Sequence, residues 1–215
     1  MLLDYLESGV MGYRPITKNN YDLYECMSAM QKCIRRGQTI DALYWAFEMA
    51  ESGFLNACLE RLKITSYEDI GNTDMQVVLY ANQAISDVKH FNDSGKDAWK
   101  LPFTGIVVSL SQAKKSRDND NLIGAITHAR ATQPKKPIPD FALDKHTIRG
   151  KQLGRGMEHF LKEGAKLEPD HSNPEFKALG ETGFMWMSKN PQWKSKDIPQ
   201  GSSKETGEIK LSDFE

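Results

Sequence analysis

The feature that most constrains this chain is a run of apolar residues with the period of an α-helix over residues 21–74. Its first part places one apolar side chain every three or four residues, at Leu23, Met27, Met30 and Ile34. After Gly37 the same spacing returns at Ile40, Leu43, Phe47 and Ala50. Because residues three and four apart share one face of a helix, the pattern predicts two amphipathic helices. The short connection at Gly37 requires these helices to lie roughly antiparallel.

Similar stripes predict further helices over residues 55–62, 77–88, 103–110 and 122–129. The residues suited to cap the predicted helices are Asn20, Thr39, Asp74 and either Asp120 or Asn121. The sequence contains no alternation with a period of two and no strand–helix–strand order. We therefore predict an all-α fold class, with the helices packed as a bundle.

The balance of charge excludes a globally basic protein. The chain carries 28 Lys and Arg against 29 Asp and Glu, so its net charge of −1 creates no overall field for nucleic acid or a membrane. Cys26, Cys33 and Cys58 form no Cys-x-x-Cys pair, which indicates free thiols in a reducing compartment, and we expect a cytoplasmic protein. The opening residues lack a signal-peptide pattern, and the longest apolar run, residues 105–110, is too short to cross a bilayer.

Changes in composition divide the chain into four segments. A lead-in over residues 1–19 precedes a helical domain over residues 20–132. The proline-bracketed sequence QPKKPIP then opens a basic extension over residues 133–188 that contains Gly and His. Residues 189–215 are polar, and we expect them to form a disordered tail.

The sharpest local motif joins the acidic residues Glu68 and Asp69 to the sequence IGN at residues 70–72. Two carboxylates beside a glycine are compatible with a binding site. Acidic residues are also common where helices begin and end. We interpret the motif as a helix end and a turn, with Asp74 capping the next helix.

The same part of the chain carries a family resemblance. The fragments YDL…SA…K.IR, DALYW and R…EDIGN.D resemble the C-terminal half of the RarA/MgsA family. These are replication-associated AAA+ proteins, related to the Werner-helicase-interacting protein and more distantly to clamp loaders. The matching residues are Tyr21, Asp22, Leu23, Ser28, Ala29, Lys32, Ile34, Arg35, Asp41, Ala42, Leu43, Tyr44, Trp45, Gly53, Arg61, Glu68, Asp69, Ile70, Gly71, Asn72 and Asp74.

This resemblance implies a helical collar that forms oligomers, typically tetramers, in DNA replication, recombination or repair. A RarA-like protein hydrolyses ATP in its N-terminal half. The present sequence contains no GxxxxGK[ST] phosphate loop, so we expect no ATPase activity, no catalytic residues and no cofactor. The partners that the resemblance implies are further copies of this chain and a replisome protein such as a sliding clamp, a single-strand-binding protein or a separate AAA+ ATPase.

The candidate residues for the oligomer interface are Tyr44, Trp45 and Phe47. Because a helix turns about 100° per residue, Tyr44 and Trp45 cannot both lie on the stripe that Leu43 and Phe47 set. Aromatic rings occur in protein cores and in interfaces, so packing of both rings within the monomer is an equal alternative.

Basic residues in two segments are candidates for contact with single-stranded or forked DNA. The first segment is the loop over residues 112–121, which stands where the family has a loop of its own. The second is residues 145–166, part of a stretch over 130–166 with nine Lys or Arg against four acidic residues. Its Gly150, Gly154 and Gly156 would let backbone amides approach a phosphate. The candidate nucleic-acid-binding residues are Lys114, Lys115, Arg117, Lys145, Arg149, Lys151 and Arg155. A solvated basic turn between two helices would have the same composition.

A third alternative is an enzyme built around Asp144, His146, His159 and Glu163. His159 and Glu163 stand four residues apart and would share a helix face, as metal ligands can. No third ligand follows at a suitable spacing, so we expect no metal site.

Residues 210–214, KLSDF, share Leu, Ser and Phe with the QLSLF-type peptides that bind bacterial sliding clamps. An acidic tail that ends near Phe also resembles the tails of single-strand-binding proteins. Matches of this length arise often by chance, so we interpret the segment as part of the tail.

Overall fold

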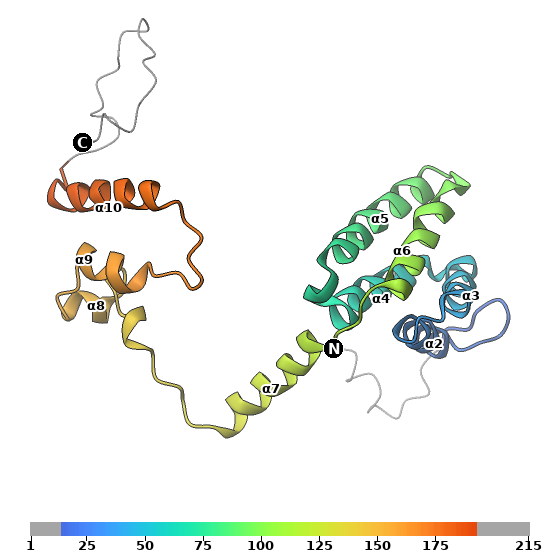
Figure 1. Cartoon of the computed structure of the whole chain (residues 1–215). Coiled ribbons are helices and arrows are strands. Elements are labelled where there is room, and N and C mark those ends of the chain that lie inside the picture. Colours follow the sequence, from blue (N-terminus) through green and yellow to red (C-terminus); the bar gives the residue numbers. More distant parts are fainter. Residues whose placement is uncertain (1–13, 193–215) are drawn as a thin grey trace, which may run out of the picture. The chain divides into compact units, whose positions relative to one another are not determined.

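Helices account for most of the chain that the structure describes. The computed structural model describes residues 14–192, and within them extended pairing is limited to one β-bridge between Ile16 and Asp22 (Figure 1). The all-α prediction is therefore confirmed. The chain divides between Pro134 and Lys135 into two compact units, which we describe separately. No helix among the described residues is both long and apolar enough to span a bilayer.

Unit 1, as described, begins with a loop and continues as a series of helices. Its α-helices are α2 (Leu23–Arg35), α3 (Thr39–Met49), α4 (Leu55–Asp69), α5 (Met75–Asp93), α6 (Lys100–Gln112) and α7 (Asp118–Thr132). Short helical turns connect them, namely the π-helix Ala50–Phe54 and the 3-10 helices Gly71–Asp74 and Asp97–Trp99.

Helices α2 to α6 enclose a single hydrophobic core. The stripe predicted for α2 is confirmed, because Leu23, Met27, Met30 and Ile34 are all buried. Helix α6 contributes Phe103, Ile106, Val107 and Leu110, each without exposed surface. At roughly 1.5–3 kcal/mol for each large apolar side chain, this burial is the main force that holds the bundle together.

The stripe predicted for α3 is wrong at Ile40, which is 78% exposed. The residues that α3 buries most deeply are Ala42, Ala46 and Met49, which have the same helical spacing on another face. Small alanine side chains leave room for α2 to pack closely against α3, whereas Ile40 and Tyr44 point outward. The other three residues of the predicted stripe do lie against the core, because Ala50 is buried and Leu43 and Phe47 pack against it. A pattern based only on large apolar residues therefore missed Ala42 and Ala46 and included Ile40 wrongly.

The predicted helix caps are partly correct. Asp74 accepts a hydrogen bond from the Val77 amide at 3.4 Å and caps α5 as predicted. Asn20 is not the cap of α2, since Asp22 accepts from the first amides of that helix. The remaining corrections concern Thr39, which is the first residue of α3, and Asp120 and Asn121, which lie within α7. More than one Asp or Asn residue can stand near the start of a helix, as Asn20 and Asp22 do before α2, and the contacts in the folded chain decide which of them caps the helix.

The loop before α2 is anchored by a buried carboxylate. Glu48 on α3 is only 8% exposed, and its two oxygens accept hydrogen bonds from the backbone and the side chain of Asn19. The Thr17 hydroxyl also bonds to this group, and together these donors lower the pKa of Glu48.

Unit 2 consists of short helices with little core of its own. They are the 3-10 helix Asp140–Ala142, α8 (Ile148–Gln152), α9 (Met157–His159), the π-helix Phe160–Gly164 and α10 (Pro174–Lys189). Among the described residues of this unit, the only buried ones are Leu143 and Gly150. A Cβ atom at Gly150 would lie 1.8 Å from the Asp144 carbonyl oxygen, so the close packing there requires glycine.

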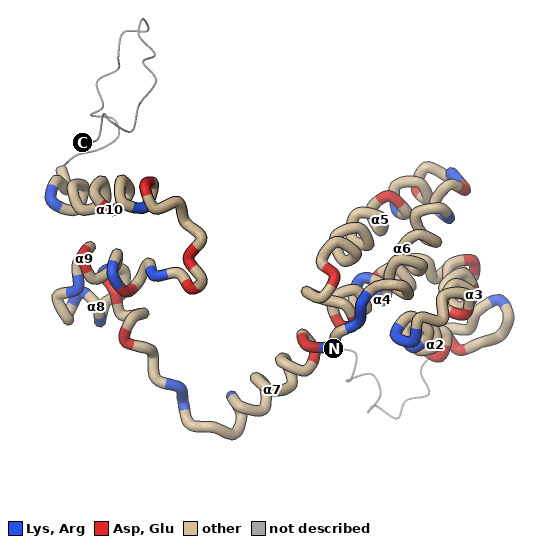
Figure 2. Tube along the Cα trace, viewed as in Figure 1, with Lys and Arg blue, Asp and Glu red and all other residues tan. Residues whose placement is uncertain are grey.

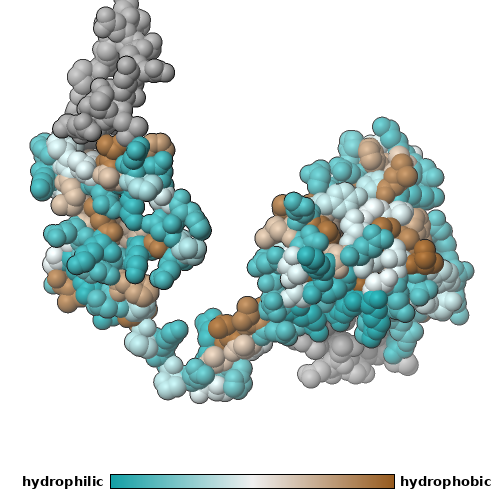
Figure 3. Space-filling view, viewed as in Figure 1, coloured by the Kyte–Doolittle hydropathy of each residue, from teal (hydrophilic) through white to brown (hydrophobic). Residues whose placement is uncertain are grey.

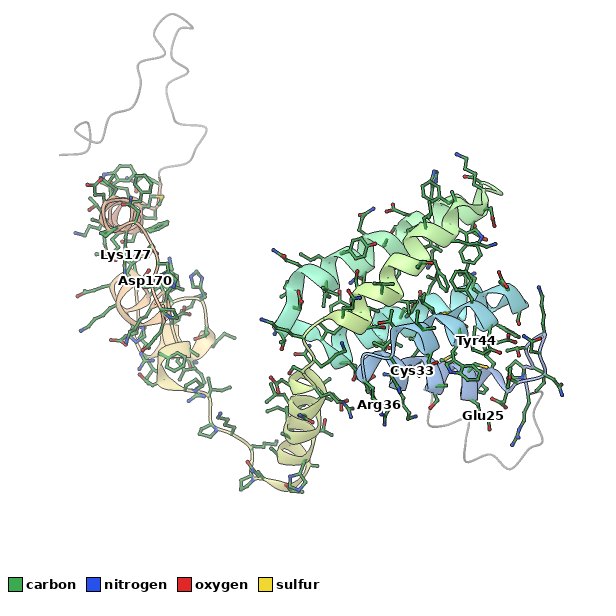
Figure 4. All side chains as sticks on the ribbon, turned by 45° about the vertical axis from the view of Figure 1, so that its right-hand side comes forward. Glu25, Cys33, Arg36, Tyr44, Asp170 and Lys177 are labelled. Carbon is green, nitrogen blue, oxygen red and sulfur yellow. The ribbon has the colours of Figure 1, made fainter. Side chains whose placement is uncertain are left out.

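The loop before α10 is held to that helix by an ion pair. Asp170 Oδ2, on the loop, lies 2.7 Å from Lys177 Nζ, on α10, and Figure 4 labels the two residues beside each other. The hydrogen bond from Lys177 lowers the pKa of Asp170 well below its ordinary value. The tail expected over residues 189–215 and the clamp-like residues 210–214 lie almost wholly outside the described residues.

Candidate functional site

A cluster of ion pairs joins three parts of unit 1, and we call it the Glu68–Asp69 cluster; it comprises Gln31, Arg35, Glu68, Asp69 and Arg117. From α2, Arg35 Nε lies 2.7 Å from Asp69 Oδ1, and Arg35 Nη2 lies 2.7 Å from Glu68 Oε1. From the loop after α6, Arg117 Nη2 lies 3.2 Å from Glu68 Oε1 and Nε lies 3.7 Å from Asp69 Oδ1. Gln31 Nε2 donates to both carboxylates, at 3.0 Å and 3.2 Å. The cluster thus ties α2, the end of α4 and the loop before α7 together.

Asp69 is the centre of this cluster, with a side chain that is 1% exposed. A carboxylate at that depth remains charged only where cations and hydrogen-bond donors surround it. Burial disfavours the charge of Arg35, but its hydrogen bond to Asp69 prevails and raises the pKa of Arg35. The geometry indicates that the Glu68–Asp69 cluster has a structural role, as a joint that holds α2, the end of α4 and the loop before α7 together.

The joint fixes where α7 begins. The Ser116 amide donates to the Asp69 carbonyl at 2.9 Å, and Asn119 Nδ2 donates to the Tyr67 carbonyl at 3.1 Å. Gly71, with a φ of +54°, lies so close to Asn119 that an added Cβ would come within 2.6 Å of Nδ2. The predicted helix end and turn at residues 68–74 are confirmed, but the sequence did not reveal that the motif holds α7 in place.

Beyond this joint, α7 exposes an apolar face. Leu122, Ile123 and Ile126 are 58–67% exposed, and no residue of α7 is buried. Together with Ile64 and Tyr67 of α4 they line an open groove of about 830 Å³, which we call the α4–α7 groove. Figure 3 shows strongly hydrophobic residues on the surface of this part of unit 1.

A second apolar surface lies on α2 and α3, and we call it the aromatic patch; it comprises Tyr21, Ile40, Tyr44 and Trp45. The Trp45 ring makes edge contacts with Tyr21 and Tyr44, at centroid distances of 5.3 Å and 5.0 Å. A hydrogen bond between the two tyrosines raises the pKa of Tyr44, whose side chain lies on the outside of α3 (Figure 4). Half-exposed rings in mutual contact are typical of a recognition surface.

Phe47, the third residue predicted for an interface, makes its ring contacts inside the protomer. Its ring meets Phe103 edge-on at a centroid distance of 5.2 Å and lies 6.2 Å from Trp99. Of the Tyr44–Trp45 pair, for which the sequence left an interface and the monomer core as alternatives, Tyr44 faces outward and Trp45 is partly buried against the core, where Phe47 also packs.

Several of the basic residues predicted to bind nucleic acid already have partners within the chain. Arg117 belongs to the Glu68–Asp69 cluster, and Lys115 Nζ donates to the carbonyls of Ser111 and Ala113 at the end of α6. Burial lowers the pKa of Lys115. In unit 2, Arg155 donates to two carbonyl groups of the turn at residues 140–143 and pairs with Asp140 at 2.6 Å.

The other basic candidates are more accessible. Lys145 Nζ lies over the Phe160 ring, 5.5 Å from its centroid. Lys114 is exposed in the loop after α6, and Arg149 and Lys151 are exposed on α8. Figure 2 shows that Lys and Arg are spread over both units and interspersed with acidic residues.

Two of the residues considered for an enzyme, Asp144 and His146, have local structural contacts. Asp144 accepts a hydrogen bond from the His146 amide at 2.9 Å, and the His146 ring packs edge-on against Phe160. His159 has a buried Nδ1 without a hydrogen-bond partner among the described residues. Within residues 14–192, no group of three or more His, Cys, Asp or Glu side chains is placed to hold a metal ion.

The sequence matches a protein family and two known proteins. The family described as "MgsA AAA+ ATPase C terminal" matches residues 37–169. Replication-associated recombination protein A of Bacillus subtilis (strain 168) is 30% identical over 139 residues, which cover 63% of this chain and 32% of that protein. The protein of the same name from Haemophilus influenzae (strain ATCC 51907 / DSM 11121 / KW20 / Rd) is 29% identical over 179 residues, 79% of this chain and 36% of that protein.

The chain thus spans about a third of the length of these relatives. The family match includes α3 to α7, the Glu68–Asp69 motif and the part of unit 2 up to residue 169. The RarA/MgsA resemblance is confirmed, and the chain belongs to the family of the MgsA AAA+ ATPase C-terminal region.

Proposed function

We propose that the chain is a non-catalytic helical module that assembles with further copies of itself, as a tetramer, in DNA replication, recombination or repair. The names of its relatives link them to replication-associated recombination. The residues of this chain contain no phosphate loop, so its contribution to such a process is assembly and contact with partners. Its proposed setting is the cytoplasm.

The observation that carries this proposal is the aromatic patch. Ile40 and Tyr44 stand one helical turn apart on the outer face of α3, and they are 78% and 51% exposed. The patch adjoins the core through Trp45, which is partly buried. Burial of a large apolar side chain contributes roughly 1.5–3 kcal/mol, so covering this patch with a second copy stabilises a dimer.

A tetramer requires more than one such surface. In a closed tetramer with dihedral symmetry, each protomer uses at least two different surfaces, each of which meets its own copy across a two-fold axis. The aromatic patch supplies one surface, and the α4–α7 groove is a second apolar surface on the same unit.

The mass of the protein in solution tests this proposal. Four copies of the 24.3 kDa chain give about 97 kDa by light scattering at tens of micromolar. We expect Tyr44→Lys to reduce the assembly to a dimer of about 49 kDa, because a buried lysine at this site is unfavourable. Leu79→Lys, on an exposed part of α5, serves as the control and is expected to leave the tetramer intact. A parent protein of 24.3 kDa at these concentrations overturns the proposal.

Weak DNA binding is a second candidate function, supported by the exposure of Arg149 and Lys151 on α8. Two cations on one short helix provide contacts to phosphate but no means of reading a base sequence. The partner of the assembled module would then be single-stranded or forked DNA, in addition to a sliding clamp, a single-strand-binding protein or a separate AAA+ ATPase.

A further inference from the structure

We propose that α7 pairs with α7 of a second copy in an antiparallel arrangement, with each helix lying along the α4–α7 groove of the other. This inference rests on the proposed function of self-assembly, and it names the second interface that the tetramer needs.

The first argument is that α7 lacks a packing partner within unit 1 over most of its length. Its start is held by Arg117 and Asn119, but no residue among its 15 is buried. An isolated helix of about 12–15 residues is only marginally stable in water. An external partner along the exposed face therefore stabilises α7 as well as the assembly.

The second argument is the position of the apolar residues around the helix. At 100° per residue, Leu122, Ile123 and Ile126 fall on one side of α7, the side that lines the groove with α4. Gly124 and His128 fall on the opposite side. The apolar face is thus a single stripe near the middle of the helix, as a helix–helix contact requires.

The third argument is charge, and it selects a second copy as the occupant. The first turn of α7 carries Asp118 and Asp120, and Glu68 lines the groove at the same end. Arg117 pairs with Asp120 and with Glu68, so Asp118 is the acidic side chain of this turn that is available to a partner. The last turn carries Arg130, and residues 121–132 contain no acidic residue. Figure 2 shows the acidic residues of α7 gathered at its start. An antiparallel α7 therefore places the end with Arg130 against the end with Asp118 of its partner, whereas parallel pairing would place like charges together.

In an antiparallel pair, a two-fold axis at the level of residue 124 brings the apolar stripe of one α7 into contact with the apolar stripe of the other. Leu122 of one helix then faces Ile126 of the other, and Asp118 faces Arg130. Because every contact occurs twice, the same residues supply both halves of the interface.

Two substitutions on the stripe test the pairing. Ile123→Lys combined with Ile126→Lys is expected to convert a 97 kDa tetramer of the 24.3 kDa chain into a dimer of about 49 kDa in light scattering. Asn121→Lys adds charge to the opposite, exposed side of α7 and is expected to leave the tetramer unchanged. Addition of Tyr44→Lys to the double variant is expected to give a monomer, since both surfaces are then disrupted.

Disulfide formation tests which face of α7 meets the second copy, in the full chain with Cys33→Ser. Leu122→Cys with Ile126→Cys is expected to give covalent dimers on a non-reducing gel after mild oxidation. Gly124→Cys with His128→Cys has the same spacing on the opposite side, where a Cβ at Gly124 meets open space, and is expected to remain monomeric on the gel.

The outcomes separate this inference from the proposed function. If the parent is a tetramer and the lysine double variant is still a tetramer, the α7 pairing is wrong and self-assembly stands. If both cysteine pairs cross-link equally, the proposed face is wrong. A monomeric parent protein overturns the self-assembly and this pairing with it.

Discussion

Replacement of Asp69 by alanine tests the Glu68–Asp69 cluster most directly. The side chain is 1% exposed and binds Arg35 at 2.7 Å, so its removal takes one carboxylate from a partly buried guanidinium group. Breaking a buried ion pair by removing one partner costs about 3–5 kcal/mol. Arg35 is 28% exposed and keeps its contact with Glu68, which reduces the loss. We expect Asp69→Ala to lower the free energy of unfolding by about 2–3 kcal/mol.

Urea and thermal unfolding of the full chain, followed by helical circular dichroism, measure this loss. The expected change corresponds to a decrease of about 10 °C in the Tm of unit 1. Asp97→Ala is the matched control, because Asp97 pairs with Lys100 at 3.0 Å but its side chain is 82% exposed. That control is expected to cost less than about 1 kcal/mol. Equal losses in the two variants would show that the cluster contributes no more than a surface ion pair.

The remaining predictions concern a buried acid, DNA and ATP. Because the pKa of folded Glu48 is lowered, its contribution to stability is present above the unfolded value of about 4.3 and is lost as the pH falls below it. Glu48→Gln is thus expected to flatten the loss of stability as the pH falls below about 4.3 in urea titrations, and an unchanged slope there would refute this. Arg149→Ala with Lys151→Ala is expected to weaken single-stranded DNA binding and to reduce the slope of log K against log salt by about 1.4. Equal binding by the parent and this variant at low salt would leave α8 without a role in DNA contact. Calorimetric titration with Mg-ATP is expected to give no saturable heat, because no phosphate loop is present in the sequence; a saturating isotherm would contradict this.

The sequence predicted the fold class because its apolar stripes are long and regular. On α2 the large residues from Leu23 to Ile34 mark the buried face without ambiguity. On α3 the same rule was only partly correct, since Leu43 and Phe47 do pack against the core but Ile40 is exposed and the most deeply buried positions include Ala42 and Ala46. Alanine carries little weight in an apolar pattern, although its small size is what allows close helix packing. Which face is buried therefore depends on the neighbouring helix, and the sequence of α3 alone does not contain that information.

The chemistry of the candidate site was harder to predict than the fold. Glu68 and Asp69 stand out in the sequence, but their partners Arg35 and Arg117 come from positions that are 33 or more residues away. The spacing of buried residues along α4 did contain one signal. Leu62, Ser66 and Asp69 follow one another on the buried face of this helix, so the spacing places the Asp69 carboxylate at a core position. A buried acid requires a cation. The basic loop at residues 114–117 was predicted to contact DNA, and the structure places two of its three cations in contacts within the chain.

The Glu68–Asp69 cluster also leads to a prediction about assembly, because it holds the helix that we propose as an interface. Ser116, Arg117 and Asn119 fix the start of α7 against α4, and Asp69 is bound by Arg117 through its carboxylate and by Ser116 through its backbone.

If α7 pairs with a second copy, loss of the Asp69 carboxylate removes a contact that holds the start of α7 in place. Association must then also order α7, which costs free energy. A cost of about 1.4 kcal/mol corresponds to a tenfold change in a dissociation constant. We therefore expect Asp69→Ala to raise the dimer–tetramer dissociation constant at least about tenfold, although the substituted residue lies outside the helix pair. Sedimentation equilibrium at a temperature where circular dichroism shows full helix content provides the measurement, with Asp97→Ala as the control. A folded Asp69→Ala protein that dissociates at the same concentration as the parent would show that the anchor and the interface are independent.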